Sequence, residues 1–190
     1  MKTYLAYQNQ IGGLRDVSET VKAIEKIAAS SVHFLKENAA NLDFYAARIK
    51  KQLDRLSLFY AGKNHPALKK SPGKKALIVI TGDKGLVGGL WHKIINAFLE
   101  TAGEYQYVIS VGKKGSEYLV EENAPVIKSF DRVSGASQDQ SVREIIDFIF
   151  NEFGRGRFSA ADVLYPEFVS LAQQEPVFSP SCLFNLSRRK

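Results

Sequence analysis

The residues with the clearest potential for chemistry form the loop ITGDKGLVGGL, from Ile80 to Leu90. Four glycines and a lysine follow a strand-like run, KKALIVI, and precede a helix-like run, a context in which proteins hold phosphate groups. A P-loop, however, needs Lys and then Ser or Thr after its last glycine, and here Gly89 and Leu90 follow Gly88. The dinucleotide pattern also fails in every frame. The sequence therefore argues against a nucleotide site in this loop.

The same residues are typical of a tight strand-to-helix turn. Glycine accepts positive φ angles and lets two backbone segments approach closely. Asp83 would bring a carboxylate close to any phosphate held here. We therefore interpret Asp83, Gly85, Gly88 and Gly89 as residues of a structural turn, and we expect no cofactor.

Side chains capable of catalysis or metal binding do not form a recognisable set elsewhere. The carboxylates are not joined to a histidine by any motif spacing, and the serines lack the surroundings of a nucleophile elbow. These residues are Asp83, Glu121, Glu122 and Asp131, with Ser110, Ser116 and Ser129. The histidines are scattered without metal-ligand spacing, at His33, His65 and His92. We expect no catalytic residue and no metal site.

Composition restricts the class of protein. The chain has 190 residues, of which 45% are hydrophobic, so it has room for one domain and an extension. Its single cysteine, Cys182, excludes an internal disulfide. No apolar run approaches the roughly 20 residues needed to cross a bilayer, and no signal peptide opens the chain. The net charge of +6 favours acidic partners.

The first third of the chain predicts one long helix. No glycine or proline occurs between Gly13 and Gly62. Apolar residues recur there at alternating steps of three and four, with one irregular step before Val32, which is a coiled-coil seam with a stutter. Asp16 and Glu19 form a possible capping box near its start. Such a helix would be roughly 70 Å long. The alternative is a hairpin of two shorter helices that breaks near residues 38–41.

The remaining residues predict a separate unit. Prolines, glycines and lysines are frequent in residues 63–75, which we interpret as a basic linker between a long coiled-coil helix at residues 1–62 and a domain at residues 76–190. In that domain, strand-like runs at 76–80, 105–111 and 124–130 alternate with helical runs at 90–100, 113–123 and 141–153. A closing strand pair is expected at 161–170 and 176–186, with edges or bulges at its prolines. The fold class is α/β, with three layers and a mostly parallel sheet.

Two stretches together resemble the gamma subunit of F-type ATP synthases, the central stalk of the rotary motor. VKAIEKIAASSV, from Val21 to Val32, is similar to the core of that family's N-terminal helix, and ITGDKGLVGGL is similar to its first-strand signature. The order of elements also agrees from about residue 10 onward. The resemblance implies a Rossmann-like domain without a nucleotide site, and a non-catalytic role.

The chain also departs from the family's pattern. Val87 and Trp91 stand where the family commonly has Cys and Asn, Gly82 replaces Ser, and Gly12 and Gly13 fall in the helix start. We expect the family's long C-terminal helix, which pairs with the N-terminal one, to be missing after LSRRK. A fragment, a split gene and a divergent paralogue remain open as explanations.

The resemblance further implies partners and a location. The expected partners are the alpha, beta and epsilon subunits and the c-ring, at the cytoplasmic face of an energy-transducing membrane, with a second helix in trans covering the seam. The expected contact residues on the seam and shaft face are Lys22, Ile24, Lys26, Ala28, Leu35, Leu42, Ile49 and Leu53. Alternatives are a freestanding coiled-coil adaptor without rotor duty and a basic nucleic-acid-binding protein. No DNA partner is expected, because no recognised binding module accompanies the positive charge.

Overall fold

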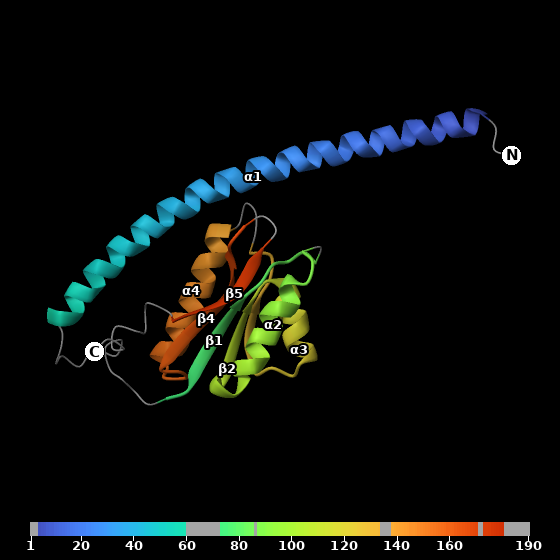
Figure 1. The fold of residues 1–190 in the computed structure, drawn as a ribbon. Helices are drawn as coiled ribbons and strands as arrows, with labels where there is room; N and C mark the ends of the chain where they lie inside the picture. The colour runs from blue at the N-terminus through green and yellow to red at the C-terminus, as the bar shows by residue number, and fades with distance from the viewer. Residues whose placement is uncertain (1–3, 60–72, 86, 134–137, 171–172, 181–190) are drawn as a thin grey trace. The chain divides into compact units, whose positions relative to one another are not determined.

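The structure is a computed structural model that describes residues 4–59, 73–85, 87–133, 138–170 and 173–180. The chain divides into two compact units, with the boundary after Leu56. Figure 1 shows the elements of both units in chain order from blue to red. The predicted linker lies largely outside the described residues. Its last residue, Lys75, belongs to the first strand instead, because it pairs with Ala160 in the parallel ladder.

The first unit is one helix, α1, from Tyr4 to Phe59. It is continuous, so the single-helix prediction is confirmed and the hairpin that breaks near residues 38–41 is wrong. Asp16 and Glu19 lie inside this helix, so they do not form a capping box at its start. Gly12 and Gly13 are interior helix residues, although each costs about 1 kcal/mol relative to alanine in such a position.

The second unit is an α/β domain built from five strands and three α-helices. Its elements are β1 (Lys75–Ile80), α2 (Leu90–Thr101), the short 3₁₀ helix η2 (Ala102–Glu104), β2 (Tyr107–Val111), α3 (Lys113–Glu121), β3 (Val126–Phe130), α4 (Gln138–Gly154), β4 (Ala160–Phe168) and β5 (Gln174–Pro180). The strand order in the sheet is β3-β2-β1-β4-β5. The pairs β1–β2, β2–β3 and β1–β4 are parallel. The edge strand β5 is antiparallel to its neighbour β4. The predicted mostly parallel sheet is thus confirmed.

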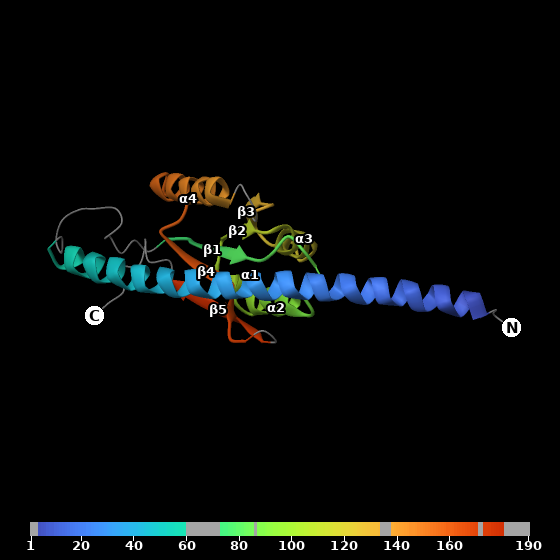
Figure 2. The ribbon, with the colours of Figure 1, turned by 90° about the horizontal axis from the view of Figure 1, so that it is seen from above.

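Helices cover both faces of this sheet, which gives the predicted three layers (Figures 1 and 2). Alternate residues of β1 point to opposite faces. Leu77 and Val79 pack with Ile94 and Phe98 of α2. Ala76 and Ile78 belong to the second core, which α4 covers through residues such as Ile149. α2 and α3 therefore lie on one face and α4 on the other.

The prolines predicted at sheet edges occupy positions where a missing N–H is tolerated. Pro166 faces Pro176 across the β4–β5 pair. β4 pairs with β1 only as far as Leu164, so Pro166 lies beyond that ladder. Pro176 and Pro180 are in β5, an edge strand. The predicted continuation of this strand beyond residue 180 lies outside the described residues.

Candidate functional site

The glycine-rich loop follows the carboxyl end of β1, where the strand order changes direction. β2 lies on one side of β1, and β4, much later in the chain, lies on the other. In open α/β sheets this edge is where ligands usually bind. The contacts of residues 81–89 therefore decide what the loop does.

Thr81 joins the end of β1 to the end of β2 and the start of α3. Its backbone N–H donates to the carbonyl oxygen of Val111 at 2.7 Å. Its hydroxyl donates to the same carbonyl at 3.1 Å and accepts a hydrogen bond from the Gly115 N–H at 2.9 Å. The first residue after β1 is thus tied to two other elements.

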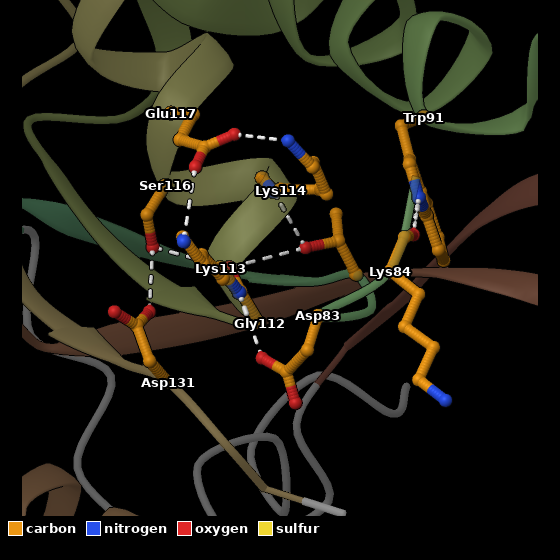
Figure 3. A network of polar contacts seen from close by, with 11 residues as sticks. Asp83, Lys84, Trp91, Gly112, Lys113, Lys114, Ser116, Glu117 and Asp131 are labelled. Carbon is orange, nitrogen blue, oxygen red and sulfur yellow. Dashed lines mark hydrogen bonds and ion pairs between the residues drawn. The ribbon is translucent and has the colours of Figure 1, made fainter. Parts of the chain in front are cut away.

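Asp83 extends this connection to the third strand. Its Oδ1 accepts hydrogen bonds from the backbone N–H groups of Lys113 and Arg132, both at 3.0 Å. Lys113 begins α3 and Arg132 follows β3. Figure 3 shows the Asp83 carboxylate directed at this neighbouring backbone. One carboxylate therefore connects the carboxyl ends of β1, β2 and β3.

Two glycines are required by backbone geometry at this edge. Gly88 has a φ of 61° and lies in the left-handed region that glycine favours. Gly112 has a φ of 99°, and a Cβ there would lie 2.5 Å from the carbonyl oxygen of Thr81. By contrast, Gly89 has a φ of −83°. A Cβ on Gly85 would only contact the flexible end of Lys114, at 3.4 Å. The structure thus gives a backbone reason for glycine at Gly88, and gives none at Gly85 or Gly89.

Trp91 closes the loop from the side of α2. Its indole Nε1–H donates to the carbonyl oxygen of Lys84 at 2.9 Å (Figure 3). Its ring lies so close to Gly82 that a Cβ at that position would be 2.8 Å from the ring. The indole is 91% buried, at 9% exposure, and belongs to the core beneath α2. The loop is therefore packed against its own helix.

The polar side chains around the turn contact one another. Ser116 donates to the hydroxyl of the fully buried Ser110 at 2.9 Å and lies 3.4 Å from the Asp131 carboxylate. Lys114 forms a 2.6 Å ion pair with Glu117. The hydrogen bond and charge of Lys114 lower the pKa of the Glu117 carboxyl, and the hydrogen bond and charge of Glu117 raise the pKa of the Lys114 ammonium. The side chains of Lys114 and Glu117 are 33% and 41% exposed, and solvent screening keeps the contribution of this pair to stability small.

The sequence-predicted residues are thus only partly brought together. Asp83, Ser110, Ser116 and Asp131 meet at one edge of the sheet. His92 instead stacks on Tyr118, with ring centroids 4.8 Å apart. Among the residues that the structure describes, no group of three or more His, Cys, Asp or Glu could hold a metal ion. The arrangement connects strand ends, and it does not present an acid, a base and a nucleophile to a common point.

Sequence reasoning missed Thr81, Gly112, Gly115 and Trp91. The signal that could have found the glycines is VGKKG, from Val111 to Gly115, which repeats after β2 the strand–glycine–lysine pattern of the loop after β1. The role of Trp91 had no such signal, since its residue type alone does not say which backbone carbonyl it reaches.

The second candidate site is the apolar seam of α1. Most of its large side chains are exposed, from 41% for Ile49 to 69% for Leu14. The predicted contact residues Ile24, Leu35 and Leu42 are 61–65% exposed, and Leu53 is partly buried. Lys22 and Lys26, one turn apart, are exposed as well. Among the described residues, no helix is both long and apolar enough to span a membrane.

Fold and site together define a two-unit α/β protein in which a long helix presents an exposed apolar seam and the strand-end loop is closed by internal bonds. The family profile described as ATP synthase matches residues 3–184. The chain belongs to this family, and the relatives described below are ATP synthase gamma chains. The resemblance predicted from residues 21–32 and 80–90 is thereby confirmed.

Several gamma chains show the extent of the similarity. The ATP synthase gamma chain of Desulforamulus reducens is 25% identical over 173 residues, covering 90% of this chain and 61% of the relative. That of Paracoccus denitrificans is 28% identical, covering 89% and 62%. The chloroplastic gamma chain of Spinacia oleracea is 28% identical, covering 90% and 49%. The chain thus spans less than two thirds of the length of these relatives.

Two solved structures are similar at lower identity. The rotor of the Euglena gracilis mitochondrial ATP synthase, in rotational state 1, gives a TM-score of 0.46 at 15% identity, covering 80% of this chain and 64% of that one. The central stalk and c-ring structure of the Tetrahymena thermophila mitochondrial ATP synthase gives 0.45 at 14% identity, covering 70% and 71%.

The family match does not favour the adaptor or the nucleic-acid-binding alternative.

Proposed function

We propose that this chain acts as a central-stalk, gamma-type subunit of an F-type ATP synthase. In this role it couples ion translocation through a membrane ring to ATP synthesis or hydrolysis on alpha and beta subunits. The observation that carries the proposal is α1, a helix of 56 residues whose apolar seam is exposed, on a chain that belongs to this family. A helix with such a stripe requires partners that cover it.

The coupling would be mechanical. An asymmetric shaft makes different contacts with three otherwise equivalent catalytic sites, and each site then has a different affinity for nucleotide. One face of α1 would be turned toward acidic levers on the beta subunits. This face would consist of Lys22, Lys26 and the small side chain of Ala28. Exposed lysines one turn apart are electrostatically complementary to such levers.

The seam would contact a second helix. Ile24, Leu35, Leu42, Ile49 and Leu53 follow one another along this seam. Burying each large aliphatic side chain contributes about 1.5–3 kcal/mol, so a partner helix gains most of its affinity from them. The α/β unit would lie below the catalytic subunits, at the cytoplasmic face of the membrane, and would contact the epsilon subunit and the c-ring.

The chain itself would be non-catalytic and would need no cofactor. The loop at the sheet edge supports this part of the proposal, because its polar groups are bonded within the domain. Thr81 and Asp83 bond to the ends of neighbouring strands, and the Lys84 carbonyl accepts from Trp91 of α2. ATP chemistry would then take place on the neighbouring subunits alone.

A native purification with an affinity tag on this chain tests the proposal. We expect alpha and beta subunits at about three copies each per copy of this chain, as three equivalent sites around one shaft require. Leu42→Asp should reduce their recovery, whereas Phe44→Asp should not. Phe44 is 66% exposed against 65% for Leu42 but lies two residues off the seam. Recovery of the chain without alpha and beta subunits would refute the rotor role.

A further inference from the structure

The turn that follows α4 presents two arginines that are held by one buried carboxylate. We propose that this turn, residues 154–157, is a docking site for an acidic segment of another protein, whose carboxylates bind Arg155 and Arg157. This inference rests on contacts within the α/β unit and does not depend on the proposed function.

The backbone of the turn is fixed by a Schellman motif. The N–H of Gly156 donates to the carbonyl oxygen of Phe153 at 2.9 Å, and that of Arg157 donates to the carbonyl oxygen of Glu152 at 3.1 Å. Gly156 has a φ of 73°, the left-handed conformation that is usual at this position of the motif. Arg155 and Arg157 therefore flank a glycine whose conformation is set by the end of the helix.

Glu152 binds both arginine side chains. It lies three residues after Ile149 of the core, and its side chain is 4% exposed. Its Oε1 lies 3.0 Å from Nη1 of Arg155, and its Oε2 forms an ion pair with Nε of Arg157. Two guanidinium groups share one carboxylate, so two positive charges and one negative charge leave the cluster at +1.

The buried position of Glu152 gives it a positioning role. A buried ion pair is a weak source of stability, because both charges lose contact with water. An apolar side chain of similar size would fill the same space without that cost. The two ion pairs do fix where the guanidinium groups lie, and the side chains of Arg155 and Arg157 are still 73% and 44% exposed. Glu152 is therefore a positioning residue for two arginines that present donors to solvent.

The donors and the charge of this cluster fit a carboxylate. The N–H groups of a guanidinium form a planar fork, and this fork matches the two oxygens of a carboxylate. Hydrogen bonds between such charged groups are stronger than those between neutral ones. One carboxylate of a partner would also neutralise the net charge of the cluster. An acidic protein segment supplies such groups.

Two lysines lie near the turn but are bonded elsewhere. The N–H of Ser159 donates to the carbonyl oxygen of Lys74 at 2.9 Å, which brings the start of β1 beside the end of the turn. The Lys74 ammonium donates to the Tyr107 hydroxyl at 3.1 Å. The Lys75 ammonium pairs with Glu104 at 3.5 Å. The docking surface is thus the arginine pair, which is smaller than the clusters of about four to eight Lys or Arg that bind anionic membranes.

A peptide titration on the full chain tests the site. The probe is an acetylated tetraglutamate peptide, followed at low salt through the NMR signals of the arginine Nε–H groups. We expect saturable shifts at Arg155 and Arg157, and none at Arg143, an exposed arginine in the first half of α4. Arg155→Gln should raise the dissociation constant about fivefold or more, because charge-assisted hydrogen bonds are lost, whereas Arg143→Gln should change it less than about twofold.

Glu152→Met tests the positioning role. If charge alone mattered, removing a negative charge beside the site would tighten peptide binding. Because Glu152 orders the two arginines, we expect the dissociation constant to rise about threefold or more instead. Trp91 fluorescence checks that the α/β unit of this variant is folded. The comparison of Arg155→Gln with Arg143→Gln needs only exposed positions, so it decides the proposal even if Glu152→Met does not fold.

The results that would overturn the proposal are distinct. One is peptide binding that is indifferent to Arg155→Gln, another is an equal shift at Arg143, and a third is tighter binding by a folded Glu152→Met variant. Vesicles of phosphatidylcholine and phosphatidylglycerol in equal parts supply the membrane comparison. Vesicle binding that Arg155→Gln abolishes, without saturable peptide binding, would assign the turn to a lipid surface instead.

Discussion

The Asp83 carboxylate accepts a hydrogen bond from the backbone N–H of Arg132, 3.0 Å away and 49 residues later in the chain. The same oxygen, Oδ1, also accepts from the backbone N–H of Lys113. A loop that resembles a phosphate-binding turn in its composition thus directs its carboxylate to two neighbouring strand ends. This relationship explains how a glycine-rich loop at a sheet edge can be part of the scaffold.

Removing this carboxylate should destabilise the α/β unit. Asp83→Ala deletes two charge-assisted hydrogen bonds, but both are exposed and water can replace them in part. We expect a loss of about 1–2 kcal/mol in the free energy of unfolding. Urea unfolding followed by Trp91 fluorescence measures it. Asp131→Ala, which loses only the 3.4 Å contact to Ser116, should cost less than half as much, and equal costs would contradict the assigned role.

Gly88→Val should destabilise the same unit by about 1 kcal/mol or more. The φ of 61° at Gly88 is unfavourable for any side chain with a Cβ and most unfavourable for a β-branched one. Thermal unfolding gives the measurement. Gly154→Ala serves as the control, because Gly154 ends α4 without a positive φ and its added methyl group would meet nothing within 4 Å. A midpoint unchanged by Gly88→Val would refute the turn geometry.

The two units should unfold in separate transitions. Trp91 is the only tryptophan and lies in the core of the α/β unit, so its fluorescence reports that unit. Ellipticity at 222 nm is dominated by α1, whose seam side chains are exposed and add no core of their own. We expect the ellipticity to fall at lower denaturant than the fluorescence changes. Superimposable curves would show that the units are coupled.

The isolated chain should bind Mg-ATP with no useful affinity. The loop lacks the lysine and hydroxyl positions of a P-loop, and Asp83 places a negative charge within it. Isothermal titration calorimetry on the isolated chain measures the affinity. A stoichiometric site of micromolar affinity would contradict this prediction.

A gamma-type C-terminal helix added in trans should stabilise α1. The partner covers the seam, so helical content and the melting temperature should both rise. Leu42→Asp should abolish this gain, because truncating or charging a buried leucine in a helix contact costs about 2–5 kcal/mol. Circular dichroism of the mixture gives the measurement. If the added helix changes neither quantity, or if Phe44→Asp is as harmful as Leu42→Asp, the partner-helix proposal fails.

Local signals in the sequence were sufficient to predict α1, the alternation of strands and helices, and the family. The absence of glycine and proline between Gly13 and Gly62, together with the seam, predicts a continuous helix, because both act over a few neighbouring residues. The capping box predicted at Asp16 and Glu19 was wrong, because the helix continues through Gly12 and Gly13 despite their low propensity. Buried strands such as β1 are recognisable for the same local reason.

The tertiary structure alone decided how the strand ends are connected. Gly112 requires its φ of 99° and its missing side chain because Thr81, 31 residues earlier, lies against it. Trp91 reaches the Lys84 carbonyl, and Asp83 reaches Arg132, only once β1, β2 and β3 lie side by side. Sequence periodicity records which face of an element is apolar, whereas these contacts depend on which elements become neighbours. That choice is made by packing across the whole sheet, so no short stretch of residues contains it.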